Sequence, residues 1–348
     1  MKTGVLILNF GEPENPTLEE VIPFLERIFA RNASLEPEKG RGSSSGRARK
    51  LAEARAPGLI EEYKRIGGSP LSQQARKQAR MVERILRRRG LTVRCYSGMQ
   101  FTEPSVAAAV AEAQAGGTEQ LVALPVYPLC GRSTTVAALD DVRTAMTELS
   151  WDVPLREITG WHRHPAYQRL RADAILDYVK RKGVDLHAAD TRLVFSAHGT
   201  PLKYLDDGPR YVAYVEEVCR MVARELGISN YALGYQNHTN RDIAWTAPDV
   251  ETVIREVDAA RVIVDAVSFM HEQSETLGEL DVELRETAEE VGLEFHRIPI
   301  PHDDAAFAAL LADLVEDVLR PEPIMGELGL RRCLCRATPD TFCLNAAD

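Results

Sequence analysis

The sequence predicts an α/β protein made of two similar halves, each a parallel sheet covered by helices. Short apolar runs alternate with amphipathic helical patterns along the 348 residues, as they do in βα units. One apolar run ends in the motif FGEP at 10–13, and another ends in HGTP at 198–201. A second pair of apolar runs, at 121–126 and 262–267, recurs in the same order. The repetition indicates a duplicated architecture.

The first half contains one long insertion. We expect strands at 5–8, 91–96, 120–126 and 155–158, and helices from Thr17, at 47–63, at 71–89, from Pro104 and up to Leu149. Residues 14–90 separate the first two strands, and the Gly- and Ser-rich stretch at 41–46 is typical of a loop. Long insertions at the carboxyl end of a strand usually form lids or pocket walls. We therefore expect this insertion to border a binding cleft.

The second half repeats the alternation without such an insertion. We expect strands at 192–197, 231–235, 261–267 and 293–297, with helices at 210–226, 249–257 and 272–291 and a closing helix that carries Phe307 and Leu311. The expected organisation is a first domain at 1–160, a second domain at 161–320 and a cysteine-bearing tail at 321–348.

Composition excludes several classes of protein. The chain is 45% hydrophobic and 27% charged, as soluble globular proteins are, and no run approaches the roughly 18 apolar residues that span a bilayer. A strand begins almost at once and leaves no room for a signal peptide, so we expect a cytoplasmic protein. The formal charge of -10 argues against the basic face that phosphate backbones require. We therefore expect no nucleic-acid partner.

His198 is the first candidate for chemistry. It follows a buried apolar run and precedes Gly199 and Pro201, so we expect it at the carboxyl end of a strand. Open α/β sheets bind their ligands at this edge. A histidine at a strand end is also often a hydrogen-bonded structural residue, and this alternative stays open.

The helix after the 261–267 strand carries many carboxylates. They are Glu272, Glu275, Glu279, Glu283, Glu286 and Glu290. A solvated acidic face is the simplest interpretation. However, Glu275 lies in the first turn, at the sheet edge where we also expect His198. An imidazole that faces a carboxylate can move protons or hold a divalent transition metal. Glu279 and Glu283, about one turn apart, would then pass a cation inward.

The cysteines indicate a second site. Six cysteines are few for a disulfide framework. Three of them, Cys333, Cys335 and Cys343, fall in the last sixteen residues, in a segment that cannot build a core of its own. Clustered thiolates in such a tail indicate a metal or iron–sulfur site. Cys130, in a loop at a strand end, is the best-placed fourth ligand.

Several motifs together resemble the ferrochelatases over nearly the whole chain. SAHGTP at 196–201 resembles the family's catalytic-histidine motif, and ETLGELD at 275–281 resembles its acidic helix. Further matching stretches are NFGEP at 9–13, GGSPL at 67–71, GMQ at 98–100, YP at 127–128 and STT at 133–135. Ferrochelatases are lyases that insert ferrous iron into a porphyrin in haem synthesis. The resemblance therefore implies Fe²⁺ and a porphyrin as substrates.

The resemblance also implies an architecture and a set of site residues. The fold would be two Rossmann-like, chelatase-type domains, each with a four-stranded parallel sheet, and the porphyrin would lie between them. The implied catalytic pair is His198 and Glu275, and the implied metal residues are His198, Glu275, Glu279 and Glu283. The implied porphyrin-binding residues are Phe10, Gly11, Tyr127, Ser133 and Thr134. Many members carry a 2Fe-2S cluster on cysteines that correspond here to Cys130, Cys333, Cys335 and Cys343.

The chain departs from the family pattern in places. Gln273 stands where the family often has a histidine, and the residues at 235–241 differ from the family's usual sequence. Cys130 lies a few residues from the usual cluster cysteine. A cobalt or nickel chelatase for another tetrapyrrole, or a non-catalytic haem or porphyrin carrier, would share much of this site. An acidic entry path argues against the carrier. Protoporphyrin IX and coproporphyrin III both stay open as substrates, and their poor solubility favours transient contact with a membrane or a haem-pathway partner.

Overall fold

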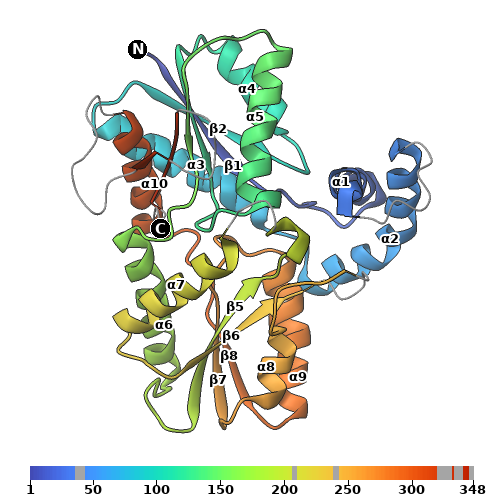
Figure 1. The fold of residues 1–348 in the computed structure, drawn as a ribbon, viewed down its shortest axis with the longest axis vertical. Helices are drawn as coiled ribbons and strands as arrows, with labels where there is room; N and C mark the ends of the chain where they lie inside the picture. The colour runs from blue at the N-terminus through green and yellow to red at the C-terminus, as the bar shows by residue number, and fades with distance from the viewer. Residues whose placement is uncertain (36–43, 206–209, 238–242, 320–330, 333–339, 345–348) are drawn as a thin grey trace.

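The chain forms two sheets, one above the other in Figure 1, with helices on both faces of each. The computed structural model describes residues 1–35, 44–205, 210–237, 243–319, 331–332 and 340–344. No helix among these residues is both long enough and apolar enough to cross a membrane.

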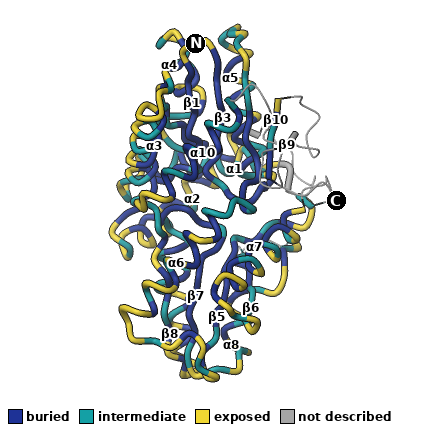
Figure 2. Tube along the Cα trace, turned by 90° about the vertical axis from the view of Figure 1, so that its left-hand side faces the viewer, coloured by how far each residue is buried: buried dark blue, intermediate teal, exposed yellow. Residues whose placement is uncertain are grey.

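Both sheets are built around a central strand from an apolar run. In the first sheet, β1 (Thr3–Asn9) lies in parallel between β2 (Val93–Met99) and β3 (Gln120–Pro125), and β4 (Leu155–Ile158) follows β3. In the second sheet, β5 (Thr191–His198) lies in parallel between β6 (Tyr231–Gln236) and β7 (Arg261–Ala266), and β8 (Glu294–Arg297) follows β7. The two halves thus share one strand order, as the repeated motifs predict. Figure 2 shows that the buried residues follow these strands.

The helices agree with the predicted alternation. They are α1 (Leu18–Arg31), α2 (Ser44–Ile66), α3 (Leu71–Arg88), α4 (Val106–Ala115), α5 (Ala137–Glu148), α6 (Pro165–Lys182), α7 (Tyr211–Glu225), α8 (Val250–Glu256), α9 (Arg285–Glu290) and α10 (Ala305–Leu319). Two π-helical stretches, Arg132–Val136 and Glu275–Leu284, precede α5 and α9. The first stretch follows β3 and the second follows β7, so they occupy equivalent places in the two halves. Both lie on the side of the molecule where the two sheets face each other.

The first sheet is larger than the sequence predicts. From the tail, β10 (Thr341–Cys343) pairs in parallel with β4, and β9 (Arg331–Arg332) pairs antiparallel with β10. The sheet therefore has six strands in the order β2-β1-β3-β4-β10-β9, whereas the second sheet has the expected four. The four predicted strands of the first half are all present, and the two tail strands were missed because a two- or three-residue strand in a polar segment shows no apolar period.

The helix α10 links the two halves. It follows the last strand of the second sheet, yet it packs against α3 of the first half as well as α6 (Figure 1). The guanidinium of Arg89, the C-cap residue of α3, lies 2.7 Å from Asp313 and 2.9 Å from Glu316 on α10. The two sheets consequently share a packed helix layer.

The long insertion divides into two parts. The helices α1 and α2 project to one side in Figure 1 and enclose their own apolar cluster, in which Phe24 and Tyr63 are buried. The end of α2 contacts the π-helix Glu275–Leu284 of the second half. By contrast, α3 packs on β2 and covers the first sheet. Thus α3 is the crossover helix of the first half, and α1 and α2 are the true addition to the repeated unit.

Candidate active site

A cleft lies where the carboxyl ends of the two sheets face each other. It encloses about 930 Å³, including the solvent space of its open mouth. Phe10 and Tyr127 line it from the first half, and His198 and Glu275 line it from the second. The two motifs that the sequence pairs, at 10–13 and 198–201, thus meet at one cleft. Among the described residues of the insertion 14–90, Leu71 lines the cleft.

His198 is the last residue of β5 and is half-buried. Its ring nitrogen Nδ1 lies 2.5 Å from the carbonyl oxygen of Gly199, and its backbone N–H donates to Ser268 Oγ at 2.8 Å. The Tyr211 hydroxyl donates to its carbonyl oxygen at 2.9 Å. A carbonyl can only accept, so Nδ1 carries the hydrogen in this contact and the lone pair of the neutral ring is on Nε2.

Glu275 begins the π-helix Glu275–Leu284 rather than the expected α-helix. Gln273 Nε2 donates to its carboxylate at 2.7 Å, and Ser274 Oγ donates to the same oxygen at 3.0 Å. Gln273 therefore orients the carboxylate in this protein. π-Helical turns are rare and frequently mark functional sites.

The predicted acidic path has a gradient of exposure. Glu275 lines the cleft, Glu279 is half-buried, and Glu283 is exposed; neither Glu279 nor Glu283 lines the cleft itself. Gln236 Nε2 donates to Glu279 Oε2 at 2.9 Å and to the Glu275 carbonyl at 3.0 Å, which ties both residues to the end of β6. Burial, followed by the charge of Glu275, raises the pKa of Glu279 to about 8. Glu272 does not join this line: it is buried and pairs with Arg297.

Glu12 is a carboxyl near the cleft that sequence reasoning missed. It is buried, and its Oε2 accepts hydrogen bonds from Ser69 Oγ at 2.5 Å and from the Ser274 backbone N–H at 3.0 Å. Burial, followed by the charge of Glu275, raises the pKa of Glu12 to about 7. The available signal was its place in the repeat, since Glu12 follows β1 as Thr200 follows β5.

The predicted porphyrin contacts are mostly cleft residues. Phe10, Tyr127, Ser133 and Thr134 all line it. The Phe10 ring is 4.5 Å from the Phe101 ring, centre to centre, and the Tyr127 hydroxyl donates to Gln100 at 2.8 Å. Burial, followed by the charge of Glu275, raises the pKa of Tyr127 well above its usual value. Tyr127 therefore stays a neutral hydrogen-bond donor.

Gly11 is not among the lining residues. Its φ is +81°, and a Cβ atom there would lie 2.4 Å from Thr102 Oγ1 and 2.7 Å from Met99 Cβ. Only glycine fits this turn without strain. The turn at Gly11 therefore allows the Phe10 side chain to line the cleft and the Glu12 side chain to be buried in the interior.

His271 is a second imidazole in the cleft wall that sequence spacing did not reveal. It is buried, and its Nε2 has no hydrogen-bond partner among the described residues. Burial, followed by the charge of nearby His302, lowers the pKa of His271 to about 3. The ring is therefore neutral at physiological pH.

Two of the four cysteines predicted to form a cluster site fall within the described residues. Cys130 is buried in the loop after β3, and Cys343 is buried at the end of β10. Backbone hydrogen bonds join residues 160–161 both to the loop before Cys130 and to the residue after Cys343. Cys333 and Cys335 lie outside the described residues. Within the described ranges, no three His, Cys, Asp or Glu side chains are grouped closely enough to hold a metal ion.

The fold resembles that of solved chelatases. Residues covering 91% of this chain superpose on SirB from Bacillus subtilis with Fe³⁺, with a TM-score of 0.53 at 9% identity and 95% of that chain covered. SirB from Bacillus subtilis subspecies spizizenii in complex with cobalt superposes with a TM-score of 0.50 at 10% identity, covering 91% of this chain and 97% of that one. The two sheets of this chain therefore have the chelatase-type fold of these solved proteins.

Sequence comparison identifies the family. The family model described as Ferrochelatase matches residues 2–319. The Ferrochelatase of Synechococcus sp. (strain RCC307) is 33% identical over 333 residues, covering 91% of this chain and 83% of the relative. That of Thermosynechococcus vestitus (strain NIES-2133 / IAM M-273 / BP-1) is 33% identical over 336 residues, covering 92% and 84%. The chain belongs to the ferrochelatase family, and its activity is the insertion of Fe²⁺ into a porphyrin in haem synthesis.

Proposed function

We propose that His198 and Glu275 are the catalytic pair of this ferrochelatase and face the incoming iron. The supporting observation is that both side chains line one cleft, although His198 ends β5 and Glu275 begins the π-helix that follows β7. The porphyrin lies between this pair and the aromatic wall formed by Phe10 and Tyr127, and Ser133 and Thr134 border it.

The pair suits the proton balance of metal insertion. When Fe²⁺ enters, the two pyrrole N–H bonds of the porphyrin break as the iron binds the pyrrole nitrogens. Two protons are therefore released for each iron that is inserted. With Nδ1–H directed at the Gly199 carbonyl, the lone pair of the His198 imidazole on Nε2 can accept one of these protons. Glu275, fixed by Gln273 and Ser274, holds the cation or receives the second proton. Imidazole and carboxylate are both suitable ligands for a divalent iron substrate.

Glu279 and Glu283 supply the approach of the metal. The series runs from exposed Glu283 through half-buried Glu279 to the cleft. Because Glu279 has a raised pKa, it exchanges a proton for a cation at neutral pH at a small energetic cost. The three carboxylates thus form a stepwise path from the surface.

A 2Fe-2S cluster on Cys130, Cys333, Cys335 and Cys343 is the second part of the proposal. Cys130 and Cys343 are both buried, and backbone near each of them is hydrogen-bonded to the same segment at 160–162, which suits two ligands of one group. The cluster would fasten the tail to β4 and supply redox chemistry. An absorption spectrum of the anaerobically purified protein tests this directly: visible iron–sulfur bands that disappear in Cys343→Ser support it, and a colourless protein with no bound iron or sulfide contradicts it.

The central experiment is an anaerobic assay with defined porphyrins. The purified protein is given Fe²⁺, Co²⁺ or Ni²⁺ with protoporphyrin IX or coproporphyrin III, and loss of porphyrin fluorescence is followed. We expect fastest turnover with Fe²⁺, and the preferred porphyrin identifies the substrate. Binding of porphyrin without metal-dependent turnover would indicate a carrier instead, and preference for cobalt or nickel would indicate a different chelatase.

A further inference from the structure

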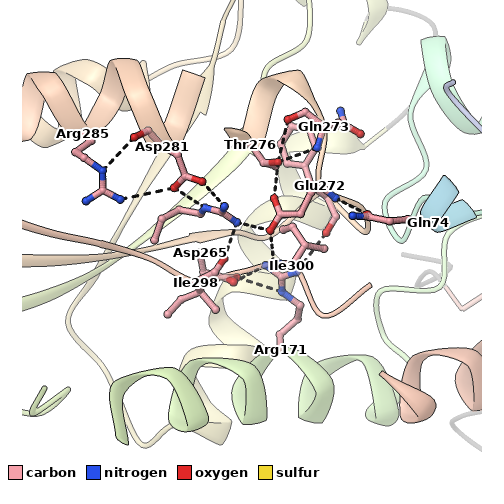
Figure 3. Close-up of polar contacts among 12 residues, drawn as sticks. Gln74, Arg171, Asp265, Glu272, Gln273, Thr276, Asp281, Arg285, Ile298 and Ile300 are labelled. Atoms are coloured by element: carbon pink, nitrogen blue, oxygen red, sulfur yellow. Dashed lines mark hydrogen bonds and ion pairs between the residues drawn. The ribbon is translucent and has the colours of Figure 1, made fainter. Parts of the chain in front are cut away.

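A largely buried ionic network joins the π-helix Glu275–Leu284 and the residues just before it to β8 (Figure 3). At its centre is Arg297, the last residue of β8, which is 8% exposed. Its Nη1 donates to Glu272 Oε1 at 2.6 Å, its Nε donates to Asp281 Oδ1 at 2.8 Å, and its Nη2 donates to the other oxygen of Asp281. One guanidinium therefore holds two carboxylates that lie on either side of Glu275 and Glu279 in the sequence.

Glu272 extends the network to the rest of the molecule. Its Oε2 accepts from the Thr276 hydroxyl at 2.6 Å, and its Oε1 accepts from the Ile300 backbone N–H at 2.8 Å. Its own N–H donates to Gln74 Oε1 on α3 at 2.9 Å. The start of the π-helix is thus joined to both halves of the chain through one residue, with the side chain of Glu272 bonded to the second half and its backbone N–H to the first.

The helix that this network holds needs support. A π-helix is normally a single turn, because its hydrogen-bond geometry and wide bore are unfavourable. This one has 10 residues, and no side-chain hydrogen bond caps its N-terminus at Ser274. Residues four apart advance slightly more than one turn in an α-helix and slightly less than one turn in the wider π-helix, so in an α-helix the line of carboxylates would drift the opposite way across the helix face. The direction of Glu275, Glu279 and Glu283 therefore depends on the wide helix being kept.

We propose that Arg297 is a positioning residue for metal delivery: by clamping Glu272 and Asp281, it keeps the π-helix in the register that points Glu275 into the cleft and Glu279 and Glu283 along the approach. The inference rests on the proposed function of these three carboxylates. It assigns the network a role in the affinity for the divalent metal and none in the affinity for the porphyrin.

The chain offers a matched control in Arg171. This residue of α6 and its partner Asp265 on β7 are both fully buried, and Arg171 Nε donates to Asp265 Oδ2 at 3.3 Å. Its Nη1 donates to the Phe269 carbonyl at 3.2 Å. Arg171 has no hydrogen bond to the π-helix among the described residues. Losing either guanidinium leaves a buried carboxylate unpaired, so both losses destabilise the fold.

The test measures metal and porphyrin affinities separately in Arg297→Met, Arg297→Lys and Arg171→Met, alongside thermal unfolding. For Arg297→Met we expect the KM for Fe²⁺ to rise about tenfold or more while the KM for porphyrin stays within about twofold, since a tenfold change corresponds to about 1.4 kcal/mol of lost positioning. Arg297→Lys recovers part of the metal affinity, because an ammonium keeps the charge but cannot fork to both carboxylates. Arg171→Met lowers the unfolding temperature without changing the KM for Fe²⁺.

An unchanged KM for Fe²⁺ in Arg297→Met, or an equal rise in Arg171→Met, would overturn the inference. If Arg297→Met does not fold, the half-exposed partner is changed instead, and Asp281→Asn is expected to raise the KM for Fe²⁺ several-fold. Equilibrium titration with Co²⁺ in the absence of porphyrin separates this inference from the proposed function. If Arg297→Met binds Co²⁺ more weakly than wild type, but wild type inserts no metal, the positioning role of Arg297 is supported and the catalytic assignment of His198 and Glu275 is rejected.

Discussion

His198 is the residue on which the proposed chemistry depends most directly. Replacing it with alanine removes the acceptor Nε2 while leaving the hydrogen bonds of its backbone to Ser268 and Tyr211 in place. General bases typically contribute about 100-fold to 10,000-fold to rate, so we expect His198→Ala to lower kcat by at least about 100-fold at an unchanged unfolding temperature. Initial rates of Fe²⁺ insertion measure this. His187→Ala, on the surface, is the control, and wild-type kcat in His198→Ala would refute the assignment.

Glu12 makes the stability of the protein depend on pH. Its pKa is raised from 4.5 to about 7, so the folded state keeps the proton while the unfolded chain loses it. Stability from this group is therefore complete below about pH 4.5, falls between about 4.5 and 7, and is constant above, with a total loss of at most about 3 kcal/mol.

Glu12→Gln removes this ionisation and should flatten the stability curve across the same interval. Urea unfolding at a series of pH values measures the free energy of unfolding of both proteins. The control is Glu19→Gln, an exposed residue of α1. Parallel curves for wild type and Glu12→Gln would show that burial of this carboxyl does not couple to folding.

The difference between His198 and Glu12 shows what sequence can predict about single residues. His198 ends an apolar run, so its neighbours along the chain place it at a sheet edge. Glu12 is equally close to a strand end, but its environment is made by Ser69 and Ser274, which are 57 and 262 positions away. Contacts of that separation leave no local pattern, and the raised pKa follows from them.

At the scale of the element, we expect changes in the acidic π-helix to alter the KM for the metal and to leave the KM for the porphyrin unchanged. Glu283 is exposed at its outer end, so its charge attracts cations through solvent. We expect Glu283→Gln to raise the KM for Fe²⁺ about twofold to threefold with kcat unchanged, and the difference should shrink at high salt because exposed charges are screened. Steady-state kinetics at two ionic strengths test this. Glu289→Gln on α9 carries the same charge change elsewhere, and an equal effect there would mean that net charge, not position, is responsible.

The same element shows where periodicity stops being informative. Carboxylates four residues apart fit both the 3.6-residue turn of an α-helix and the wider π turn, so the expected helix at 272–291 was correct in place and wrong in kind. The clamp by Arg297 comes from the next strand, β8, after the helix has ended. Only the folded chain brings the Arg297 side chain to Glu272 and Asp281.

For the whole molecule, the tail strand β10 adds stability to the first sheet. The Thr341 hydroxyl donates to Glu157 Oε2 at 2.6 Å, and Glu157, fully buried on β4, also pairs with Arg143 at 2.7 Å. Thr341→Val leaves a buried carboxylate oxygen without this donor. We expect a loss of about 1–3 kcal/mol in the free energy of unfolding, measured by urea denaturation.

The matched control for this change is Thr147→Val. The Thr147 hydroxyl donates to the Arg143 carbonyl at 2.9 Å on an exposed helix face, so its loss should cost well under 1 kcal/mol by comparison with surface substitutions generally. Equal effects of the two substitutions would mean that β10 contributes nothing to the stability of β4.

Large-scale architecture was predictable where it repeats. The shared strand order follows from apolar runs that recur in both halves, and the meeting of the two motifs at one cleft follows from the rule for strand ends. The tail strands and the position of α10 were not predictable, because neither has a counterpart in the other half. Elements outside the repeat depend on long-range packing alone.

The shared helix layer has a consequence for the thermal unfolding of the protein. Because α10 belongs to the second half by sequence and lies on α3 of the first, neither sheet can lose its cover while the other stays intact. Melting should then be a single cooperative event, with a calorimetric enthalpy equal to the van't Hoff value, even though the chain contains two sheets. The active-site walls would keep their mutual alignment up to the temperature at which the entire structure is lost.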